Sequence, residues 1–240
     1  MPNGIYSAMT GALAQEEHMD IVANNLANGS TNGFKAVQAT FKELMDEARE
    51  GSKNETQRHV ILDSTYTDFT QGPLNHTHNN MDVAIQGPGF FVVDTPEGAQ
   101  YTRNGAFMLN EKRELVTVGG HVVQGTSGTI EIPEGAMINI NQSGAVTSGT
   151  LEIGKIRVVQ FDEPQNLRRF GHNLYSAPEG VEAKDLELVN IQTGAIERSN
   201  VNMIREMTAL IKVSRSYEAF NKVISTYRAV DGTTARELGR

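Results

Sequence analysis

The sequence contains no cysteine and no tryptophan, and these absences narrow the kinds of site that it can carry. Without cysteine, disulfides and thiolate metal sites are excluded. Aromatic residues make up 6% of the chain, which argues against a base-stacking platform or a sugar-binding groove. Acidic residues outnumber basic ones, 29 to 21, and give a formal net charge of −8. Because a nucleic-acid binder usually presents a basic face, we expect no nucleic-acid partner.

Long apolar runs are also absent. No stretch approaches the roughly 20 apolar residues of a transmembrane helix, so we expect no direct membrane insertion. The first residues, from Met1 to Ile5, lack the basic flank and the continuous apolar run of a cleavable signal peptide. The residues alone therefore predict a cytoplasmic protein, unless it leaves the cell interior by a route that reads no such signal.

Two heptad patterns are present, one near each end of the chain. The first spans a helix expected from about Gly4 to Leu26 and comprises Ile5, Ala8, Ala12, Gln15, Met19, Val22 and Leu26. The second spans a helix expected from about Val201 to Val230 and comprises Met203, Met207, Leu210, Ser214, Tyr217, Asn221 and Ile224. A second apolar row lies beside it: Val213, Phe220, Val223, Tyr227 and Val230. Heptad spacing places apolar residues on the side that faces a partner helix. We therefore expect each end to pack on the other and on neighbouring copies.

The middle of the chain is rich in glycine and reads as short strands separated by turns. The pair Pro96-Glu97, followed by Gly98, predicts one hairpin, and Gly119-Gly120 predicts another. Further strands are expected within 83–93, 101–103, 130–132, 137–140, 145–147, 156–161 and 186–191. No helical pattern interrupts them, which argues against a parallel βαβ sheet. These features predict a sandwich-like or barrel-like antiparallel β domain.

The predicted fold class is therefore α+β: paired terminal helices and a central, mainly antiparallel β domain. We expect a helical domain of residues 1–36 with 200–240, a connecting segment of residues 37–74 and a β-rich domain of residues 75–199. Residues 34–49 look helical, residues 50–57 look like an exposed loop, and Ser199-Asn200 is expected to provide the N-cap of the last helix.

Candidate chemistry is weak throughout the sequence. His76 and His78 flank Thr77 and would point the same way on a strand, but no further ligands complete a metal site, so a solvated turn is favoured. Gly87-Pro88-Gly89 lacks the residue order of a phosphate-binding loop and predicts a tight turn. No pair of carboxylates is distinguished as catalytic, and no G-x-S-x-G motif is present. We therefore expect no catalytic residue, no cofactor, no metal and no enzymatic activity.

Several motifs resemble those of bacterial flagellar axial proteins, the rod, hook and hook-associated subunits. The run from Asp20 to Lys35, DIVANNLANGSTNGFK, resembles the motif in which the first helix of these proteins breaks through an Asn-rich stretch into Thr-x-Gly-Phe. Five further runs resemble motifs of the group in the same order: DVAIQGPGFFVV (82–93), YTRNGAF (101–107), GHNLY (171–175), GAIERSNV (194–201) and RSYE (215–218). The matches span nearly the whole chain, and within the group the chain resembles the rod proteins.

The short segment from Phe41 to Thr70 favours the proximal-rod type, because distal-rod proteins tend to carry a longer one; the distal-rod and hook types remain alternatives. One position departs from the group's pattern. After Phe107, Arg113 stands where the group usually has a turn glycine, which leaves the local turn open.

The resemblance implies a structural subunit of the basal-body rod. Its partners would be copies of itself, other proximal and distal rod proteins and the flagellar export apparatus, and it would be exported without a cleaved signal peptide. We expect the free termini to be poorly ordered and to fold on assembly. The expected assembly interface comprises Ile5, Met9, Met19, Val22, Asn24, Asn25, Leu26, Asn28, Thr31, Gly33, Phe34, Asn200, Val201, Met207, Leu210, Tyr217 and Ile224.

Two other classes of protein are compatible with parts of the pattern. A β-rich secreted enzyme or binding domain with oligomerising helical ends would require a cleft with a perturbed acid or base, which the sequence does not indicate. A cytoplasmic coiled-coil adaptor fits the broad apolar surface of the last helix but leaves the strand-rich middle unexplained.

Overall fold

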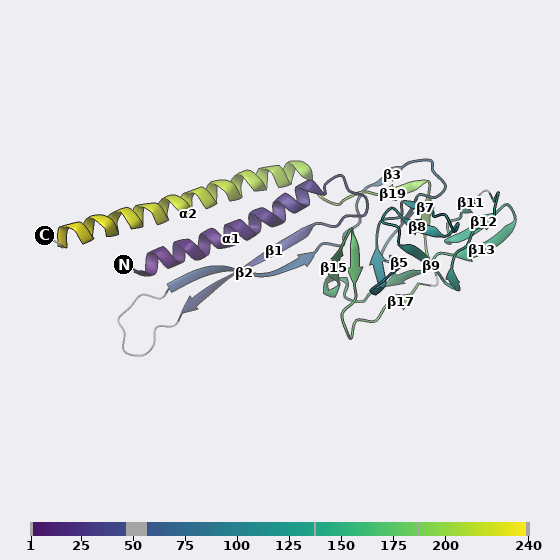
Figure 1. Ribbon diagram of the computed structural model, residues 1–240, viewed down its shortest axis with the longest axis horizontal. Helices are drawn as coiled ribbons and strands as arrows, with labels where there is room; N and C mark the ends of the chain where they lie inside the picture. Colours follow the sequence, from purple (N-terminus) through teal and green to yellow (C-terminus); the bar gives the residue numbers. More distant parts are fainter. Residues whose placement is uncertain (1, 47–56, 137, 187, 239–240) are drawn as a thin grey trace. The chain divides into compact units, whose positions relative to one another are not determined.

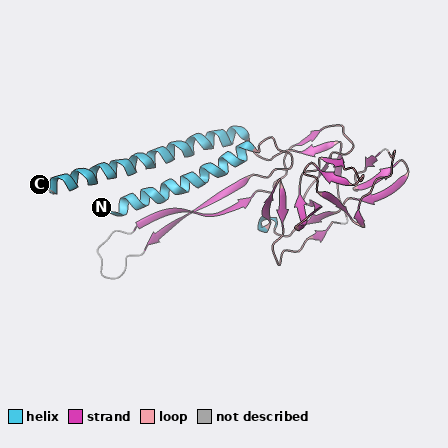
Figure 2. Ribbon diagram, in the orientation of Figure 1, coloured by secondary structure: helices cyan, strands magenta, loops and turns pink. Residues whose placement is uncertain are grey.

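A computed structural model describes residues 2–46, 57–136, 138–186 and 188–238 of the 240-residue chain. The chain divides into two compact units. The first, here called the helical unit, comprises Met1–Ala27, Val37–Thr67 and Asn202–Arg240. The second, here called the β unit, comprises Asn28–Ala36 and Asp68–Val201. The backbone therefore passes from the helical unit to the β unit and back twice. Figure 2 shows long helices at the ends of the chain and strands through most of the remainder.

The helical unit contains α1 (Pro2–Ala27), α2 (Met203–Leu238) and an antiparallel hairpin of β1 (Val37–Asp46) and β2 (Gln57–Thr67). The two terminal helices lie side by side, as predicted (Figure 1). Helical structure predicted for residues 34–49 is wrong over the described residues 34–46, because Val37–Asp46 forms β1 and pairs with β2 from Val37↔Thr67 to Asp46↔Gln57. Residues 47–49 lie outside the described residues. Residues 50–56 of the predicted loop lie outside the described residues, and Gln57 begins β2.

The start of α2 differs from the predicted cap. The predicted N-cap at Ser199-Asn200 is wrong, since α2 begins at Met203 and its cap is Asn202. The side-chain oxygen of Asn202 accepts a hydrogen bond from the backbone N–H of Arg205 at 3.1 Å, which satisfies one of the free N–H groups of the first turn. The side chain of Asn200 is used within the β unit instead.

The β unit is antiparallel at every strand pair in the described residues. Its ten-stranded sheet has the order β15-β16-β6-β5-β9-β8-β7, with β10 beside β9, β14 beside β5 and β17 beside β14. The strands of this sheet are β5 (Phe90–Thr95), β6 (Gly98–Thr102), β7 (Phe107–Leu109), β8 (Leu115–Thr117), β9 (Val122–Gly125), β10 (Gly128–Thr129), β14 (Val158–Gln160), β15 (Arg168–Gly171), β16 (Leu174–Ser176) and β17 (Lys184–Asp185).

Smaller sheets complete the β unit. A three-stranded sheet contains β11 (Ile138–Ile140), β12 (Ala145–Ser148) and β13 (Leu151–Lys155). Two-stranded sheets pair β18 (Ile191–Thr193) with β4 (Val83–Ile85), and β19 (Ala195–Glu197) with β3 (Leu74–His76). A single 3₁₀ turn, η1 (Pro164–Asn166), is the helical element among the unit's described residues. The strand predicted over 186–191 is wrong in the described residues, since β17 ends at Asp185 and β18 begins at Ile191.

Both predicted hairpins form. β5 and β6 are joined through Pro96-Glu97, with Thr95 opposite Gly98, and β8 and β9 pair with Val116 opposite Val122. Strand β5 lies at the centre of the core, because its alternate residues enter two apolar clusters. Phe91 and Val93 belong to the larger cluster, whereas Phe90 and Val92 belong to a smaller one with Phe161 and Tyr175. Burial on both faces explains why β5 reads as a continuous apolar run.

Arg113 forms the turn that the sequence left open. Its φ of +63° is the left-handed conformation that a glycine adopts without strain. Its guanidinium donates hydrogen bonds to the carbonyl oxygens of Ile132, through Nε at 2.8 Å, and of Pro133, through Nη2 at 2.7 Å. These charge-assisted bonds offset the backbone strain, so the turn forms without glycine.

Candidate assembly surfaces and buried ion cluster

The helices α1 and α2 run antiparallel and pack closely where α1 is small. A Cβ added at Gly4 would lie 2.6 Å from Oη of Tyr227, and one added at Gly11 would lie 2.7 Å from Cε1 of Phe220. The two contacts join residues seven apart on each helix, in opposite directions along the chain. Glycine thus lets an aromatic ring of α2 lie directly on the backbone of α1.

The contact face differs in part from the predicted heptad positions. On α1, Ala8, Ala12 and Val22 are buried as expected, but Gly4 and Gly11, which neighbour predicted positions, also meet α2. On α2, the most buried residue of the seam region is Val213, at 4% exposure, and it belongs to the second apolar row. Adjacent rows of one helix have the same period, so periodicity alone does not determine which row faces the partner.

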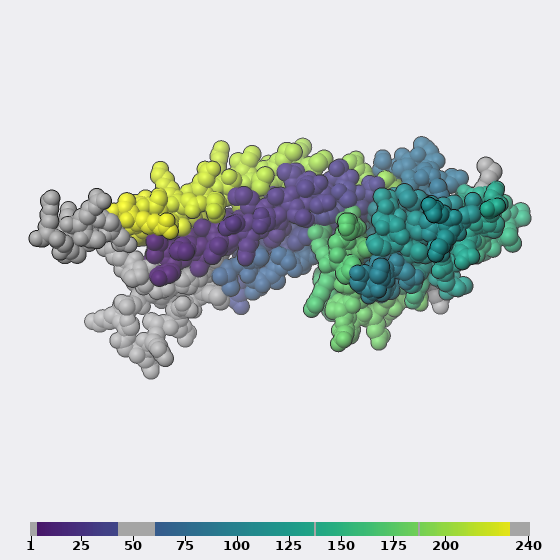
Figure 3. Space-filling view, viewed as in Figure 1, coloured from purple at the N-terminus to yellow at the C-terminus, as the bar shows by residue number. Residues whose placement is uncertain are grey.

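The predicted interface residues of the two helices range from buried to exposed in the single chain. Val22 is buried, whereas Met9 and Met207 remain 43% and 51% exposed. Asn24 is exposed, and the remaining helical positions are half-buried: Ile5, Met19, Leu26, Leu210, Tyr217 and Ile224. An open groove of about 470 Å³ lies between α1 and α2. Figure 3 shows α1 (purple) exposed along one side of the helical unit, beside α2 (yellow).

The predicted residues at the end of α1 make contacts within the chain. Asn25 is buried and binds Val37 at both backbone atoms: Nδ2 donates to the carbonyl oxygen at 2.8 Å, and Oδ1 accepts from the N–H at 2.9 Å. This side chain thereby fixes the start of β1 against α1. The following turn is closed by Thr31, whose N–H donates to the carbonyl of Asn28 at 3.1 Å and whose hydroxyl contacts the Asn28 side chain at 3.3 Å.

Backbone conformation and limited space explain why glycine precedes Phe34. Gly33 has φ +68°, its N–H donates to the carbonyl of Glu197 at 2.8 Å, and an added Cβ would lie 2.5 Å from the backbone nitrogen of Asn104. Glycine is therefore required both by conformation and by space. Phe34 is buried, and the guanidinium of Arg169 lies 4.5 Å from its ring centroid, a cation–π contact.

Asn200 ties together segments of the β unit that are distant in sequence. Its Oδ1 accepts a hydrogen bond from the N–H of Ala36 at 2.8 Å, and its Nδ2 donates to the carbonyl of Asp68 at 2.8 Å and to Thr70. Val201 follows it, half-buried, with its N–H donating to the hydroxyl of Ser199 at 3.2 Å.

Three charged side chains meet in a buried ion cluster within the β unit. Lys35 donates through Nζ to Oε1 of Glu197 at 2.5 Å, and Nη1 of Arg103 lies 3.5 Å from the other carboxylate oxygen. The side chains of Lys35 and Glu197 are fully buried, and that of Arg103 is 4% exposed. Oε1 of Glu197 also accepts from the N–H of Gly72, at 2.9 Å. One carboxylate thus holds two cations in the protein interior.

Burial dominates the electrostatics of this ion cluster. It lowers the pKa of Lys35, while the attraction and the hydrogen bond of Glu197 act in the opposite direction. Burial likewise lowers the pKa of Arg103, again opposed by Glu197. Both cations have further acceptors: Nζ of Lys35 donates to the carbonyl of Thr70 at 2.6 Å, and Nη2 of Arg103 donates to that of Gly87 at 2.8 Å.

The ion cluster was not predicted from the sequence. Each member is a charged residue inside one of the motifs described above, and the three motifs lie far apart along the chain. Lys35 ends the first motif, Arg103 follows Tyr101-Thr102, and Glu197 precedes Arg198-Ser199-Asn200. The available signal was a charged residue placed next to apolar or turn residues in each motif.

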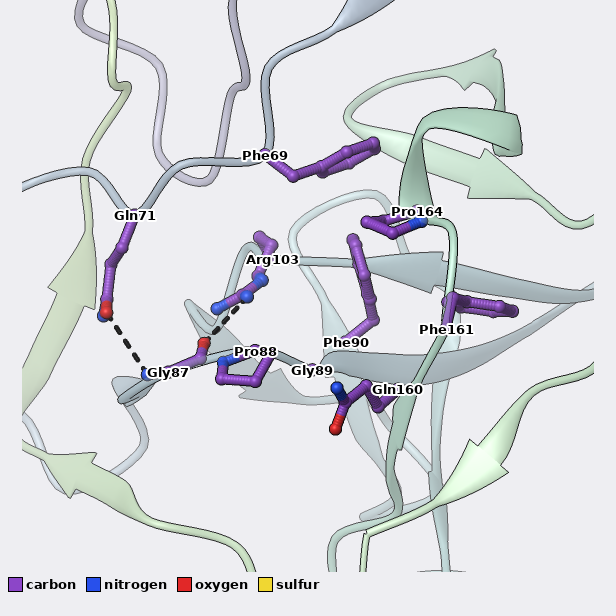
Figure 4. A pocket seen from close by; sticks show the side chains of 10 residues that line it. All are labelled: Phe69, Gln71, Gly87, Pro88, Gly89, Phe90, Arg103, Gln160, Phe161 and Pro164. Carbon is purple, nitrogen blue, oxygen red and sulfur yellow. Dashed lines mark hydrogen bonds between the residues drawn. The ribbon is translucent and has the colours of Figure 1, made fainter.

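A small pocket opens beside Arg103 (Figure 4). Its volume is about 210 Å³, below the range of typical small-molecule sites. Three phenylalanines and two prolines line it together with Arg103 and two glutamines; these residues are Phe69, Phe90, Phe161, Pro88, Pro164, Gln71 and Gln160. Gln71 closes one side, because its Oε1 accepts from the N–H of Gly87 at 3.2 Å and its Nε2 donates to the carbonyl of Ile85 at 2.8 Å.

The described residues contain no group of three or more histidine or carboxylate side chains placed to hold a metal ion. His76 lies on β3, opposite Ala195, with its ring 3.3 Å from the Gln192 amide, and His78 has φ +60° in the turn that follows. Neither helix in the described part of the chain combines the length and the apolar character needed to span a membrane.

The fold and the buried cluster define a class of chain in which both ends form one helical unit and the middle forms an antiparallel β unit. Three family models match it in order: "Flagella basal body rod protein" over residues 5–35, "Flagellar hook protein FlgE/F/G D1 domain" over 84–148 and "Flagellar basal body rod FlgEFG protein C-terminal" over 192–237. Each match contributes one member of the ion cluster.

Similar curated proteins cover the whole chain. The flagellar basal-body rod protein FlgF of Caulobacter vibrioides is 31% identical over 243 residues, covering 100% of this chain and 99% of the relative. FlgF of Mesorhizobium japonicum is 33% identical over 221 residues, covering 91% and 90%. FlgG of Buchnera aphidicola subsp. Baizongia pistaciae is 32% identical over 248 residues, covering 92% and 94%. The chain belongs to the flagellar basal-body rod protein family.

Proposed function

We propose that this chain is a structural subunit of the flagellar basal-body rod, polymerising through its terminal helices. The observation that carries the proposal is the full-length similarity to proteins named as rod subunits. The exposed apolar residues of α1 and α2 support it, because such surfaces on a helix pair need burial against another chain.

We infer the FlgF type, the proximal-rod subunit, in preference to the distal-rod FlgG type. The alignment with FlgF of Caulobacter vibrioides is 243 residues long and includes all of this chain. The alignment with FlgG of Buchnera is 248 residues long but includes only 92% of this chain. The FlgG relative therefore has more residues without a counterpart in this chain than the FlgF relative has. This difference agrees with the short segment between Phe41 and Thr70.

The proposed work of the subunit is mechanical. Terminal helices packed between subunits would form the wall of a hollow shaft, which transmits torque and lets later subunits pass through its bore. The partners are then copies of the chain, other rod subunits and the flagellar export apparatus. No residue is assigned covalent chemistry, and the predicted interface residues that stay exposed in the single chain, such as Met9 and Met207, act by burial against other chains.

We also propose that the terminal helices gain most of their stability on assembly. In the single chain, α1 contacts α2 and the β1–β2 hairpin but leaves Tyr6, Met9 and Leu13 exposed. Ordering the backbone costs about 1–2 kcal/mol per residue, which limited burial offsets poorly. Amide hydrogen exchange on the purified chain should therefore show weaker protection across residues 5–26 than in the β5 region. Equal protection in both regions would contradict this proposal.

The decisive experiment for the proposed function is cellular. A strain lacking this gene should be non-motile, and the tagged chain should restore motility and co-purify with basal bodies that span the envelope. Antibody labelling of the tag should mark the rod segment nearest the cell interior. Restored motility without the tag in purified basal bodies would overturn the proposal, and labelling along the distal segment would favour the FlgG type.

A further inference from the structure

The first turns of α2 carry an exposed apolar row that no part of the described chain buries. Ile204, Met207 and Ile211 are 79%, 51% and 56% exposed, and their spacing of three and four residues places them on one side of the helix. We call these three residues the α2 stripe. Two exposed cations, Arg205 and Lys212, lie beside it on the same helix.

The groove between α1 and α2 has a length that matches that of the α2 stripe. Its α1 wall contains Met9, Leu13 and Glu16, and its α2 wall contains Tyr217, Ile224 and Arg228. Leu13 is 57% exposed, so the wall is accessible and largely apolar. The α1 wall and the α2 stripe each span seven residue steps, or about 10 Å of helix.

The α1 wall of the groove and the flanks of the α2 stripe carry charges of opposite sign, while the cation of the groove lining, Arg228, lies on the α2 wall. Helix α1 contains no lysine or arginine, and its carboxylates are Glu16, Glu17 and Asp20, all exposed. Glu16 lies in the groove wall, whereas the α2 stripe is flanked by Arg205 and Lys212. Opposite charges at the rim of an apolar contact favour one orientation and raise the association rate.

We propose that the α2 stripe of one subunit docks in the α1–α2 groove of a second copy of this chain. The proposal rests on the proposed function and names the surfaces through which subunits meet. The stripe and the groove are different surfaces, so the contact is heterologous and continues from copy to copy without closing. Within one chain their centres lie about 15 residues apart along α2, so docked copies are offset by roughly 20 Å along the helices.

Engineered cysteines test the contact directly, because the chain has none of its own. Leu13→Cys and Met207→Cys are produced as two single variants in one cell, so that any disulfide between them joins two copies. Mild oxidation of isolated basal bodies should give a cross-linked dimer containing both variants. Ala23→Cys, at an exposed position of α1 outside the groove, replaces Leu13→Cys as the control and should give none.

Charge reversal tests the orientation. Glu16→Lys or Lys212→Glu alone should lower the cross-linked yield about tenfold, and the two reversals together should restore it. Glu17→Lys, next in sequence but outside the groove lining, should leave the yield unchanged. Absence of the dimer in basal bodies that contain both variants, or no restoration by the double reversal, would overturn the docking proposal. Absence of the wild-type chain from basal bodies would instead overturn the proposed function.

Discussion

At the scale of single residues, the unusual feature is the buried ion cluster of Lys35, Arg103 and Glu197. Two buried cations share one carboxylate, so the cluster is not favourable as an ion pair alone. Removing buried charges from water costs several kcal/mol each, and the attraction must offset this. We therefore interpret the cluster as specifying which segments of the chain pack together, with Glu197 contacting both cations.

Replacing Glu197 by glutamine should strongly destabilise the β unit. The substitution keeps the size of the side chain but leaves two buried cations without a counter-charge, which costs about 3–5 kcal/mol. Urea unfolding followed by tyrosine fluorescence would measure the change. The matched control is Asp185→Asn, which breaks the exposed pair with Arg157 and should cost less than about 1 kcal/mol. Similar losses for the two variants would refute the role given to the cluster.

At the scale of helices and strands, the sequence predicted what local patterns determine. Both terminal helices and both Gly- or Pro-containing hairpins were predicted, because period and turn chemistry are local. Strand β1 was not, since Phe41, Leu44 and Met45 are also compatible with a helix. Pairing with β2, which begins 11 residues after β1 ends, decides its structure, and no local pattern encodes that pairing.

The candidate site was predictable to a similar degree. The heptads indicated that the two helices pair. They did not indicate which apolar row of α2 is buried: Val213 is buried and Met207 is exposed, because the small residues of α1 determine which side of α2 can approach closely. The contacts of Asn25 and Asn200 depend on backbone groups brought together by folding, and so does the ion cluster. Tertiary proximity of this kind leaves no periodic trace in a single sequence.

Because Gly11 contacts Phe220, replacing this glycine by alanine should not give the stabilisation that the substitution usually gives in a helix. Alanine usually stabilises a helix by about 0.5–1 kcal/mol relative to glycine. Here the added Cβ would lie 2.7 Å from the ring, so Gly11→Ala should give no gain or a loss in thermal stability of the helical signal. In a Phe220→Ala background the usual gain should return. The same effect of Gly11→Ala in both backgrounds would show that the ring does not constrain this position.

The helical unit should loosen in mild acid through His18. Burial lowers the pKa of His18 below its ordinary value of about 6.5, and Glu206 on α2 opposes this shift. The folded helical unit therefore prefers neutral His18, whose ring also packs against that of Phe41, with centroids 5.1 Å apart and planes tilted by 58°. Its stabilising contribution is present above pH 6.5 and is lost as the pH falls toward the folded-state pKa. Thermal unfolding from pH 7 to 5 should show this slope, and His18→Gln should reduce it.

At the scale of the whole molecule, the two units should respond separately to changes at the helical surfaces. Leu26→Asp or Leu210→Asp places an ionised carboxylate on a half-buried helical position, where it is costly. Each should abolish rod assembly and swimming while the purified chain keeps the unfolding transition of its β unit. The controls are Ala23→Asp and Ala219→Asp, at exposed positions of the same helices. Normal swimming by either leucine variant would contradict the assembly role.

The ion cluster also constrains when the β unit can finish folding. Lys35 and Glu197 are separated by 162 positions, and Arg103 lies between them. A chain threaded through a narrow conduit emerges in order from one end, so whichever end leads, most of the polypeptide must clear the exit before these three side chains can meet. On the proposed export route, final folding of the β unit would therefore wait until transit is nearly finished, and the moving chain would not fold partway inside the channel.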